Sequence, residues 1–300
     1  MNWLRNKKII VTHSGNFHPD DVFAVALLSI LFKGQIKIIR TRDESKYAGA
    51  DFVVDTGLVH DPKINRFDHH QEGNAGFRAN GISYSSFGLL WQRYGEEICG
   101  SKKVADILDH KLVEVIDADD CGRALSENKV ENLYPFFLTD VIYSLLPTWK
   151  EENENIDDYF KKAVELAKGV LEREIKITQD KIEAEALVAE IYNKAKDKRV
   201  IIFDEQSLPK GLLATYPEPL FTVYLDKDKD KWRVGTIRKE ERTFEVRKNF
   251  PRAWWGKTSK DLAKITGVED AVFCRNGGIF AGAVSKEGAI KMAELALKEI

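Results

Sequence analysis

Histidines and aspartates gather in three short segments near the start of this 300-residue chain. Five of the six histidines fall between His13 and His70. The segments are residues 13–21, Asp55 and residues 68–70, and all three contain aspartate. Imidazole nitrogens and carboxylate oxygens are common ligands of divalent metal ions in proteins. The types and spacing of these residues therefore predict metal-dependent chemistry.

Asp55 is the predicted link between two metal ions. A pair of divalent ions about 3.5 to 4 Å apart needs terminal ligands on each ion and a carboxylate that bridges both. Asp55 directly follows the apolar run Phe52–Val54, which would place it at the end of a strand. The predicted terminal ligands are His13 and His18 on one ion, and Asp20, His69 and either Asp117 or Asp120 on the other.

The chemistry expected of such a pair is hydrolysis of a phosphate ester. Two cations lower the pKa of a water molecule that they share, and the hydroxide so formed attacks phosphorus. His70 lies next to a predicted ligand but on the opposite side of an extended backbone, so we expect it to contact the substrate or protonate the leaving oxygen. Asp55 and His70 are therefore the predicted catalytic residues.

Segments so far apart can meet only if the chain between them returns to one edge of a sheet. Lys8–Thr12, Gln35–Thr41 and Phe52–Val54 have the apolar, β-branched composition of strands, and Asp21–Phe32 is an apolar helical segment. Open α/β sheets bind ligands at the carboxyl ends of their strands. The predicted fold class is therefore α/β, with a parallel sheet that carries the ligands.

The remaining segments predict more helices and a second domain. A short strand over Ile64–Phe67 and helices over Ser83–Tyr94, Val104–Val115 and Ile156–Lys196 are expected from the spacing of apolar residues. From Val200 onward strands dominate: Val200–Phe203, Phe221–Leu225, Trp232–Ile237 and Val272–Phe273, before a helix from Lys286 to the end. We expect a metal-binding domain over residues 1–150, a helical connector over 151–196, and a smaller α+β substrate-binding domain over 197–300.

Cations and aromatic rings are interleaved in the last third of the chain. This is the composition that grips single-stranded nucleic acid, because bases stack on such rings. Adjacent glycines also let a main chain approach a phosphate closely. The predicted substrate-binding residues are Arg238, Arg252, Trp254, Trp255, Asn276, Gly277 and Gly278. The two tryptophans equally fit a position in the domain core.

Composition limits the class of protein. With 46 basic and 48 acidic residues the net charge is −2, so a polyanion must be held by local groups and not by an overall positive field. The three cysteines are far apart and form no CxxC pattern, which favours a reducing compartment, and we expect the cytoplasm. No apolar run reaches the roughly 20 residues of a membrane span, so no membrane partner is expected. A homodimer is left open.

Several of these motifs resemble those of a known superfamily. They are Thr12–Asp21, Val53–Gly57, Arg66–Gln71, Ile116–Gly122, Phe250–Gly256 and Gly277–Gly282. Together they are similar to the DHH phosphoesterases, and most to the melanocyte-proliferating-gene branch of metal-dependent hydrolases and RNA exonucleases. The resemblance implies a two-domain phosphoesterase with two Mn²⁺ ions and a glycine-containing substrate loop on the smaller domain. Arg275-Asn276 departs from the branch, which has a histidine near that loop.

Three functions follow from these observations. The leading one is a metal-dependent phosphodiesterase, of the 3'-5' exoribonuclease type, acting on single-stranded RNA or short oligonucleotides. The second is a phosphoesterase for a small nucleotide or a pyrophosphate, which the near-neutral charge favours. The third is a non-catalytic scaffold that binds nucleotide. Retention of every expected ligand opposes the third, because loss of function normally removes a bridging carboxylate first.

Overall fold

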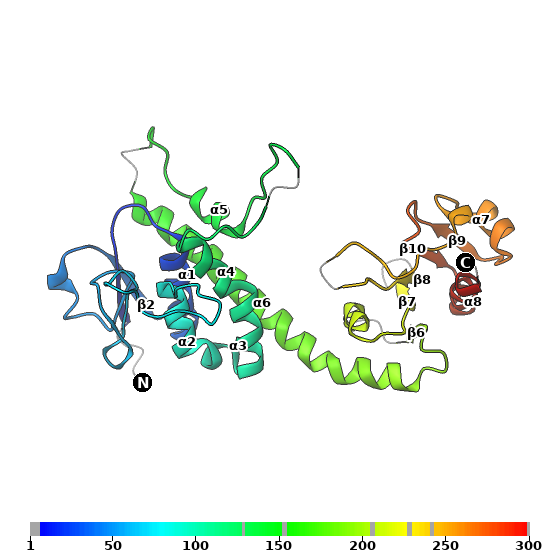
Figure 1. The fold of residues 1–300 in the computed structure, drawn as a ribbon, viewed down its shortest axis with the longest axis horizontal. Helices are drawn as coiled ribbons and strands as arrows, with labels where there is room; N and C mark the ends of the chain where they lie inside the picture. Colours follow the sequence, from blue (N-terminus) through cyan, green and yellow to red (C-terminus); the bar gives the residue numbers. More distant parts are fainter. Residues whose placement is uncertain are drawn as a thin grey trace, which may run out of the picture. The chain divides into compact units, whose positions relative to one another are not determined.

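The structure is a computed structural model, and it describes residues 7–127, 130–151, 155–204, 208–226, 230–240 and 243–298. The chain forms two compact units, residues 1–179 and 180–300. Each contains one five-stranded sheet and its own helices, which makes the protein a two-unit α/β protein. Figure 1 labels the α-helices and several of the strands.

The sheet of the first unit is mostly parallel. Its strands are β1 (Lys8–Thr12), β2 (Ile36–Arg40), β3 (Phe52–Val54), β4 (His60–Asp61) and β5 (Arg66–Phe67). They lie in the order β2-β1-β3-β5-β4, and only β4 runs antiparallel to its neighbour. The first three strands match the sequence prediction within one residue at each end. β5 is shorter than predicted, because Pro62–Ile64 form a 3-10 turn and Asn65 adopts a left-handed conformation.

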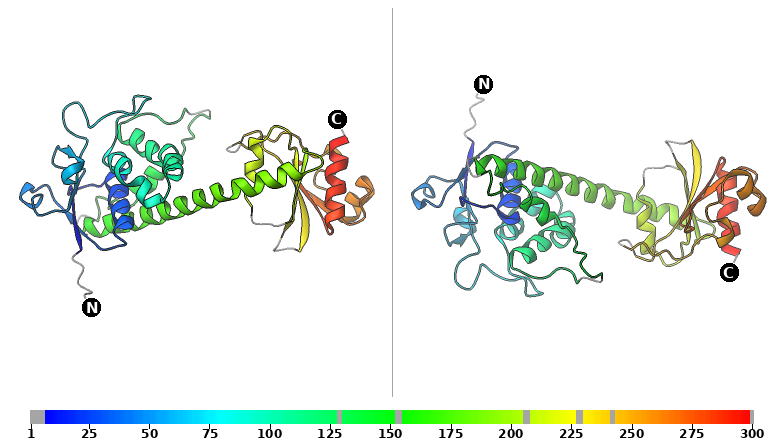
Figure 2. Two further views of the ribbon diagram at one scale, coloured as in Figure 1. Left: turned by 90° about the horizontal axis from the view of Figure 1, so that it is seen from below. Right: turned by 90° about the horizontal axis from the view of Figure 1, so that it is seen from above.

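Helix α1 (Pro19–Leu31) is the central helix of this unit. It is apolar on all sides and buried along most of its length, as expected of a helix enclosed by other elements. It packs against β3, α2 (Ser86–Cys99), α4 (Glu114–Asp120) and α5 (Leu138–Tyr143). Figure 2 shows α1 between the strands and α2 in both views.

The helical segment predicted over residues 104–115 is longer in the structure than expected, and it is interrupted. The structure has α3 (Lys102–Leu108), then a π-helical turn over Asp109–Val113, and then α4. Helix α6 (Ile156–Lys194) is the long helix predicted from the apolar spacing, and it begins in the first unit and ends in the second. None of the helices in the described ranges has the length and apolar character to span a membrane.

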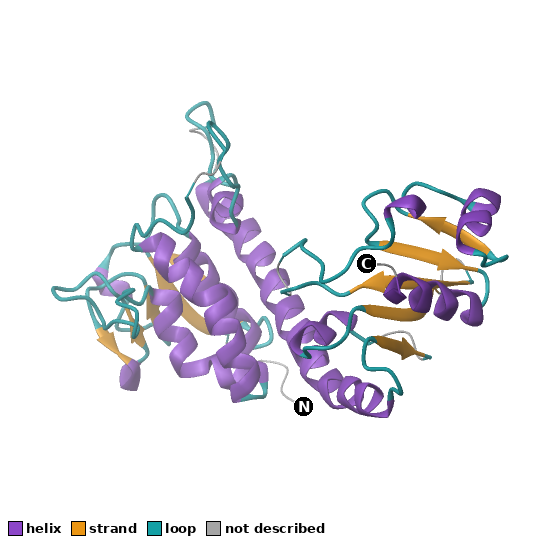
Figure 3. Cartoon of the chain, turned by 45° about the vertical axis from the view of Figure 1, so that its right-hand side comes forward, coloured by secondary structure: helices purple, strands orange, loops and turns teal. Residues whose placement is uncertain are grey.

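The sheet of the second unit is mostly antiparallel. Its strands are β6 (Val200–Phe203), β7 (Phe221–Asp226), β8 (Lys231–Thr236), β9 (Ala271–Cys274) and β10 (Phe280–Ala283), in the order β6-β7-β8-β10-β9. Helix α8 (Lys286–Lys298) packs across β7, β8 and β10, as Figure 3 shows, and α7 (Ser259–Thr266) packs on β9. Short 3-10 helices are Glu44–Lys46, Pro62–Ile64, Lys210–Thr215 and Arg252–Trp254.

Candidate metal centre

The ligand-type side chains of the first unit meet at the carboxyl edge of its parallel strands. His13 follows β1, Asp55 follows β3, and residues 68–70 follow β5. These three strands lie side by side, so their carboxyl ends bring the residues to one edge. Asp120 is the last residue of α4 and joins the same cluster.

The start of α1 supplies His18, Asp20 and Asp21. His18 is the N-cap, and its backbone N–H donates to Oδ1 of Asp21 at 2.9 Å. Pro19 follows in the first turn, where its fixed φ suits a helix. Carboxylates are favourable at this end because they face the positive end of the helix dipole. Asp20 and Asp21 are both 0% exposed, so the helix start points two carboxylates into the protein.

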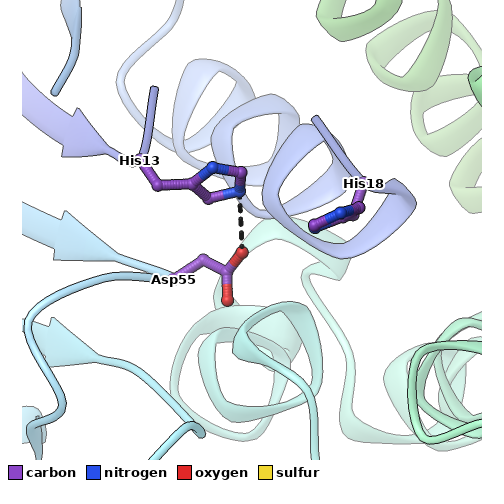
Figure 4. A group of neighbouring side chains, drawn as sticks. All are labelled: His13, His18 and Asp55. Carbon is purple, nitrogen blue, oxygen red and sulfur yellow. Dashed lines mark ion pairs between the residues drawn. The ribbon is translucent and has the colours of Figure 1, made fainter. Parts of the chain in front are cut away.

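Asp55 lies between two imidazoles. Its Oδ2 is 3.3 Å from Nε2 of His13, and its Oδ1 is 3.3 Å from Nε2 of His69. The hydroxyl of Ser86 also donates to Oδ1, at 3.0 Å. Figure 4 shows His13 directed at Asp55, with His18 at the start of α1 nearby. A carboxylate whose two oxygens face different ligand groups has the placement that a bridge between two ions requires.

The ligand atoms fall into groups that could each hold an ion. His13, His18 and Asp55 form one group, Asp20, His69 and Asp120 form another, and Asp55, His69 and His70 form a third, with the atoms of each group within 4.8 Å of one another. In the second group Nε2 of His69 is 3.8 Å from Oδ2 of Asp20 and 3.4 Å from Oδ2 of Asp120. The sequence left Asp117 and Asp120 as alternatives for this position, and it is Asp120 that lies beside His69.

Many ligand atoms of this cluster are buried without a hydrogen-bond partner. They are Nε2 of His13 and His69, both carboxylate oxygens of Asp20, and Oδ2 of Asp21, Asp55 and Asp120. A buried polar atom without a partner costs free energy, so native structures rarely contain several together. Divalent cations would satisfy all of these atoms at once. The donor set of imidazoles and carboxylates therefore fits metal ions.

The electrostatics of the cluster lead to the same conclusion. Burial raises the pKa of Asp20 well above its usual value, and burial also raises the pKa of Asp120, to about 6. Burial opposes the charge on His13, but its close contacts with the carboxylates of Asp21 and Asp55 outweigh it and raise the pKa of His13 to about 10. Burial likewise opposes the charge on Asp55, yet its contacts with two imidazoles keep the pKa of this carboxyl low. The raised pKa values of Asp20, Asp120 and His13 thus favour bound protons at positions where cations would replace them.

His70 differs from the other histidines of the cluster. Its side chain is 53% exposed, and its Nδ1 is 2.8 Å from Oδ1 of Asp68. Asp68 is itself fixed, because its other oxygen accepts the backbone N–H of Leu58 at 2.6 Å. The hydrogen bond to Asp68 raises the pKa of His70, so the protonated ring is favoured. With Nδ1 held by Asp68, the free Nε2 can face a substrate.

Asp117 occupies a different place from the cluster. It lies within α4 and accepts hydrogen bonds from Oγ of Ser85 at 2.6 Å and Nε of Arg78 at 2.8 Å. Arg78 also pairs with Asp109 through two nitrogens, at 2.7 and 2.8 Å. These contacts use both carboxylate oxygens of Asp117 and fasten the loop before α2 to α4. Asp117 therefore holds this loop against α4, the helix that carries Asp120 of the cluster.

Comparison with known proteins places the chain in a family. The MYG1 exonuclease family model, described as an uncharacterised protein family (UPF0160), matches residues 9–297. The chain belongs to the MYG1 family. The "MYG1 protein C694.04c" of Schizosaccharomyces pombe is 30% identical over 324 residues, covering 98% of each chain. The "MYG1 exonuclease" of Homo sapiens is 29% identical over 324 residues, covering 97% of this chain and 86% of its own.

One solved structure is also similar, at a low level. It is the crystal structure of an exopolyphosphatase-related protein from Bacteroides fragilis, 13% identical, covering 98% of this chain and 92% of that chain. The TM-score of 0.22 is too low to establish a shared fold. The assignment to the MYG1 family therefore rests on sequence, over almost the entire chain.

The second unit of this MYG1-family chain holds the residues predicted to bind substrate. Trp254 is 2% exposed and stacks on Phe250 with ring centroids 5.8 Å apart. Its ring is part of the core of this unit and in this position offers no face to a base. Trp255 is partly buried, its Nε1 donates to the carbonyl of Phe250 at 2.8 Å, and the exposed Arg252 lies over its ring at 5.5 Å.

The glycine pair forms a tight turn beside an exposed asparagine. Gly277 and Gly278 have φ values of +89° and +63°, which suit glycine. The N–H of Gly278 donates to the carbonyl of Arg275 at 2.9 Å, so this donor is already used within the turn. Asn276 is exposed next to it. Arg238 is also exposed, with its guanidinium 5.3 Å from the ring of Phe244.

The sequence prediction missed three residues that contact the cluster in this MYG1-family chain. Asp21 lies 3.1 Å from Nε2 of His13, Asp68 orients His70, and Ser86 donates to Asp55. The adjacent acids after His18 were a visible signal for Asp21, although the sequence could not show which of them faces His13. For Ser86 there was no signal, because a serine before an apolar run is also an ordinary helix start.

Proposed function

We propose that this chain is a two-metal phosphodiesterase of the DHH type that removes nucleotides from the end of single-stranded RNA or short oligonucleotides. The observation that carries the proposal is the buried cluster of imidazoles and carboxylates around Asp55, with several ligand atoms that lack partners. The names of the MYG1 exonuclease relatives support nucleic acid as the substrate. Manganese is the metal that the resemblance to the DHH phosphoesterases favours.

Each residue has a role in the proposed reaction. His13, His18 and Asp55 would hold one ion, and Asp20, His69 and Asp120 the other, with Asp55 between them. The ions would supply charge stabilisation at the phosphate and a hydroxide nucleophile near neutral pH. Oδ2 of Asp21 lies 3.1 Å from the same Nε2 of His13, so this carboxylate would lie beside the first ion. Ser86 fixes the Asp55 carboxylate.

His70 would transfer the proton that the leaving oxygen requires. Its Nδ1 is held by Asp68, and that contact favours the protonated ring. A protonated imidazole with a free Nε2 is a general acid. On the second unit, the exposed Arg238, Arg252 and Asn276 and the partly buried Trp255 are proposed contacts for the rest of the nucleic acid, with Gly277 shaping the turn.

Activity on end-labelled single-stranded RNA in the presence of Mn²⁺ tests this function. A ladder that shortens one nucleotide at a time is expected, together with release of mononucleotides. The matched comparison is a panel of mononucleotides and pyrophosphate under the same conditions. Phosphate release from that panel with no cleavage of RNA would support the small-molecule alternative, and metal binding without any hydrolysis would support a scaffold.

A further inference from the structure

The positively charged side chain of Arg42 lies at the edge of the cluster, and the proposed reaction gives it no role. Arg42 lies two residues beyond the carboxyl end of β2, the strand next to β1 on the side away from β3. Its side chain is exposed. Nη2 of Arg42 is 3.5 Å from Nδ1 of His13, so the guanidinium lies beside the ring whose other nitrogen faces Asp55.

The contact between Arg42 and His13 cannot be a strong hydrogen bond. Nδ1 of His13 is 3.2 Å from the carbonyl oxygen of Ser14, which can only accept, so Nδ1 carries the proton. This tautomer leaves Nε2 of His13 free to bind a metal. Figure 4 shows Nδ1 turned away from Asp55. Because Nδ1–H and the guanidinium are both donors, the N–H groups of Arg42 are left for another acceptor.

Arg42 differs from Arg40, the last residue of β2, in how its guanidinium donors are used. The Arg40 side chain is 2% exposed, pairs with Asp157 at 3.0 Å, and donates to the carbonyl of Gly15 at 2.6 Å. Its guanidinium also lies 4.5 Å from the centre of the Phe160 ring. Arg40 is thus a structural residue whose two terminal nitrogens both donate within the protein. In the described part of the chain Arg42 makes no ion pair of this kind.

We propose that Arg42 binds a substrate phosphate adjacent to the one that is cleaved. This inference rests on the proposed phosphodiesterase function. His13 lies between Arg42 and Asp55, so the exposed guanidinium stands just outside the group of ligand atoms. Arginine recognises phosphate oxygens through two parallel donors. The centre therefore takes substrates with two successive phosphates. This requirement distinguishes the end of a nucleic acid from a simple phosphodiester, which has one phosphate.

The test compares dinucleotides that differ only in a terminal phosphate. We measure kcat/KM for a dinucleotide with a 5'-phosphate, one with a 3'-phosphate and one with neither, using wild-type protein and Arg42→Ala. Wild-type protein is expected to prefer one phosphorylated form, and Arg42→Ala is expected to reduce that preference roughly 10- to 100-fold, mainly through KM. Arg42→Lys keeps the charge but loses the paired donors, so an intermediate reduction is expected.

Lys37→Ala is the matched control, because Lys37 is an exposed cation on β2, the strand that precedes Arg42, about 16 Å from Arg42 along an extended chain. It should keep the wild-type preference. Bound metal and melting temperature of Arg42→Ala should equal those of the wild-type protein. An unchanged preference in Arg42→Ala, or a wild-type protein indifferent to the terminal phosphate, overturns the inference and leaves the phosphodiesterase proposal standing. Failure of wild-type protein to cleave any dinucleotide with any divalent metal overturns both.

Discussion

At the scale of single residues, the backbone of Asp55 distinguishes the candidate metal centre. Its φ is +53°, a left-handed conformation that a non-glycine residue adopts at a cost of about 1–3 kcal/mol. The backbone N–H of Asp55 donates to the carbonyl of Phe67 at 3.0 Å, and Ser86 holds its side chain. The surrounding structure thus enforces an unfavourable conformation that presents the carboxylate between His13 and His69.

Asp55→Asn should release the metal and abolish activity while the fold persists. An amide cannot bridge two cations as a carboxylate does, so we expect bound metal to fall well below one ion per chain and activity to fall at least about 100-fold. Elemental analysis after dialysis and circular dichroism measure the two effects. Asp106→Asn is the control, since Asp106 is an exposed acid paired only with Lys102 on the surface of α3. Full metal content in Asp55→Asn would refute the bridging role.

His70→Ala should keep the metal but slow turnover. Removal of a general acid lowers kcat roughly 100- to 10,000-fold for an RNA substrate, whose leaving oxygen needs a proton. For bis(p-nitrophenyl) phosphate the loss should be much smaller, because p-nitrophenolate leaves without one. His110→Ala is the control, since His110 is 86% exposed and pairs with Glu114. Equal losses on both substrates, or loss of metal, would show that His70 is a ligand and not an acid.

At the scale of secondary structure elements, the strands and the long helix were predicted well and the loops that finish the site were not. β1, β3 and β6 have the predicted bounds, because buried β-branched runs such as Ile9-Ile10-Val11 have few alternatives. Strand β10, with the sequence FAGA, was missed since small residues carry little strand signal. Helix α7 was also not anticipated, although its Gly267 cap is a recognisable end signal.

The choice between Asp117 and Asp120 could not be made from the sequence. Both residues belong to α4 and differ by three positions, so they lie on nearby faces of one helix. What separates them is Arg78, which reaches Asp117 from a loop almost 40 positions earlier in the chain. A long-range ion pair of this kind leaves no local pattern in the sequence. The same is true of the π-helical turn that precedes α4.

Asp117→Ala and Asp120→Asn should therefore have different effects. Loss of one partner of the buried pair with Arg78 should destabilise the metal-free protein by about 3 to 5 kcal/mol. Asp120→Asn removes a carboxylate whose pKa is raised by burial, so the metal-free protein should melt no lower than the wild type, but its metal affinity should fall. Differential scanning calorimetry and isothermal titration with Mn²⁺ distinguish the two. A reversed pattern would make Asp117 the ligand.

At the scale of the whole molecule, the candidate metal ligands and the predicted substrate-binding residues lie in different units. The imidazoles of the cluster all come from the first unit, and no histidine occurs after His110. The second unit contributes an antiparallel sheet with α8 across it and a set of exposed cations. The histidine distribution predicted that the imidazole ligands come from the first half of the chain, and the long helix α6 belongs to both units.

The stability of the molecule should depend on metal and pH together. The pKa of Asp120 in the fold is about 6, above its usual value of 3.8, so its proton stabilises the metal-free protein fully below pH 3.8 and this stabilisation is lost as pH rises through about 6. Metal binds the deprotonated groups, so it should raise the melting temperature more at about pH 8 than at about pH 5. Thermal melts with Mn²⁺ and with a chelator measure this difference. An equal shift at both pH values would contradict it.

Anomalous diffraction at the manganese edge, from crystals grown with Mn²⁺, tests the central claim most directly. The account predicts two peaks about 3.5 to 4 Å apart, both bound by Asp55, with His13 on one and His69 on the other. Absence of any peak at this edge of the sheet, or peaks only at exposed acidic residues elsewhere, would contradict it.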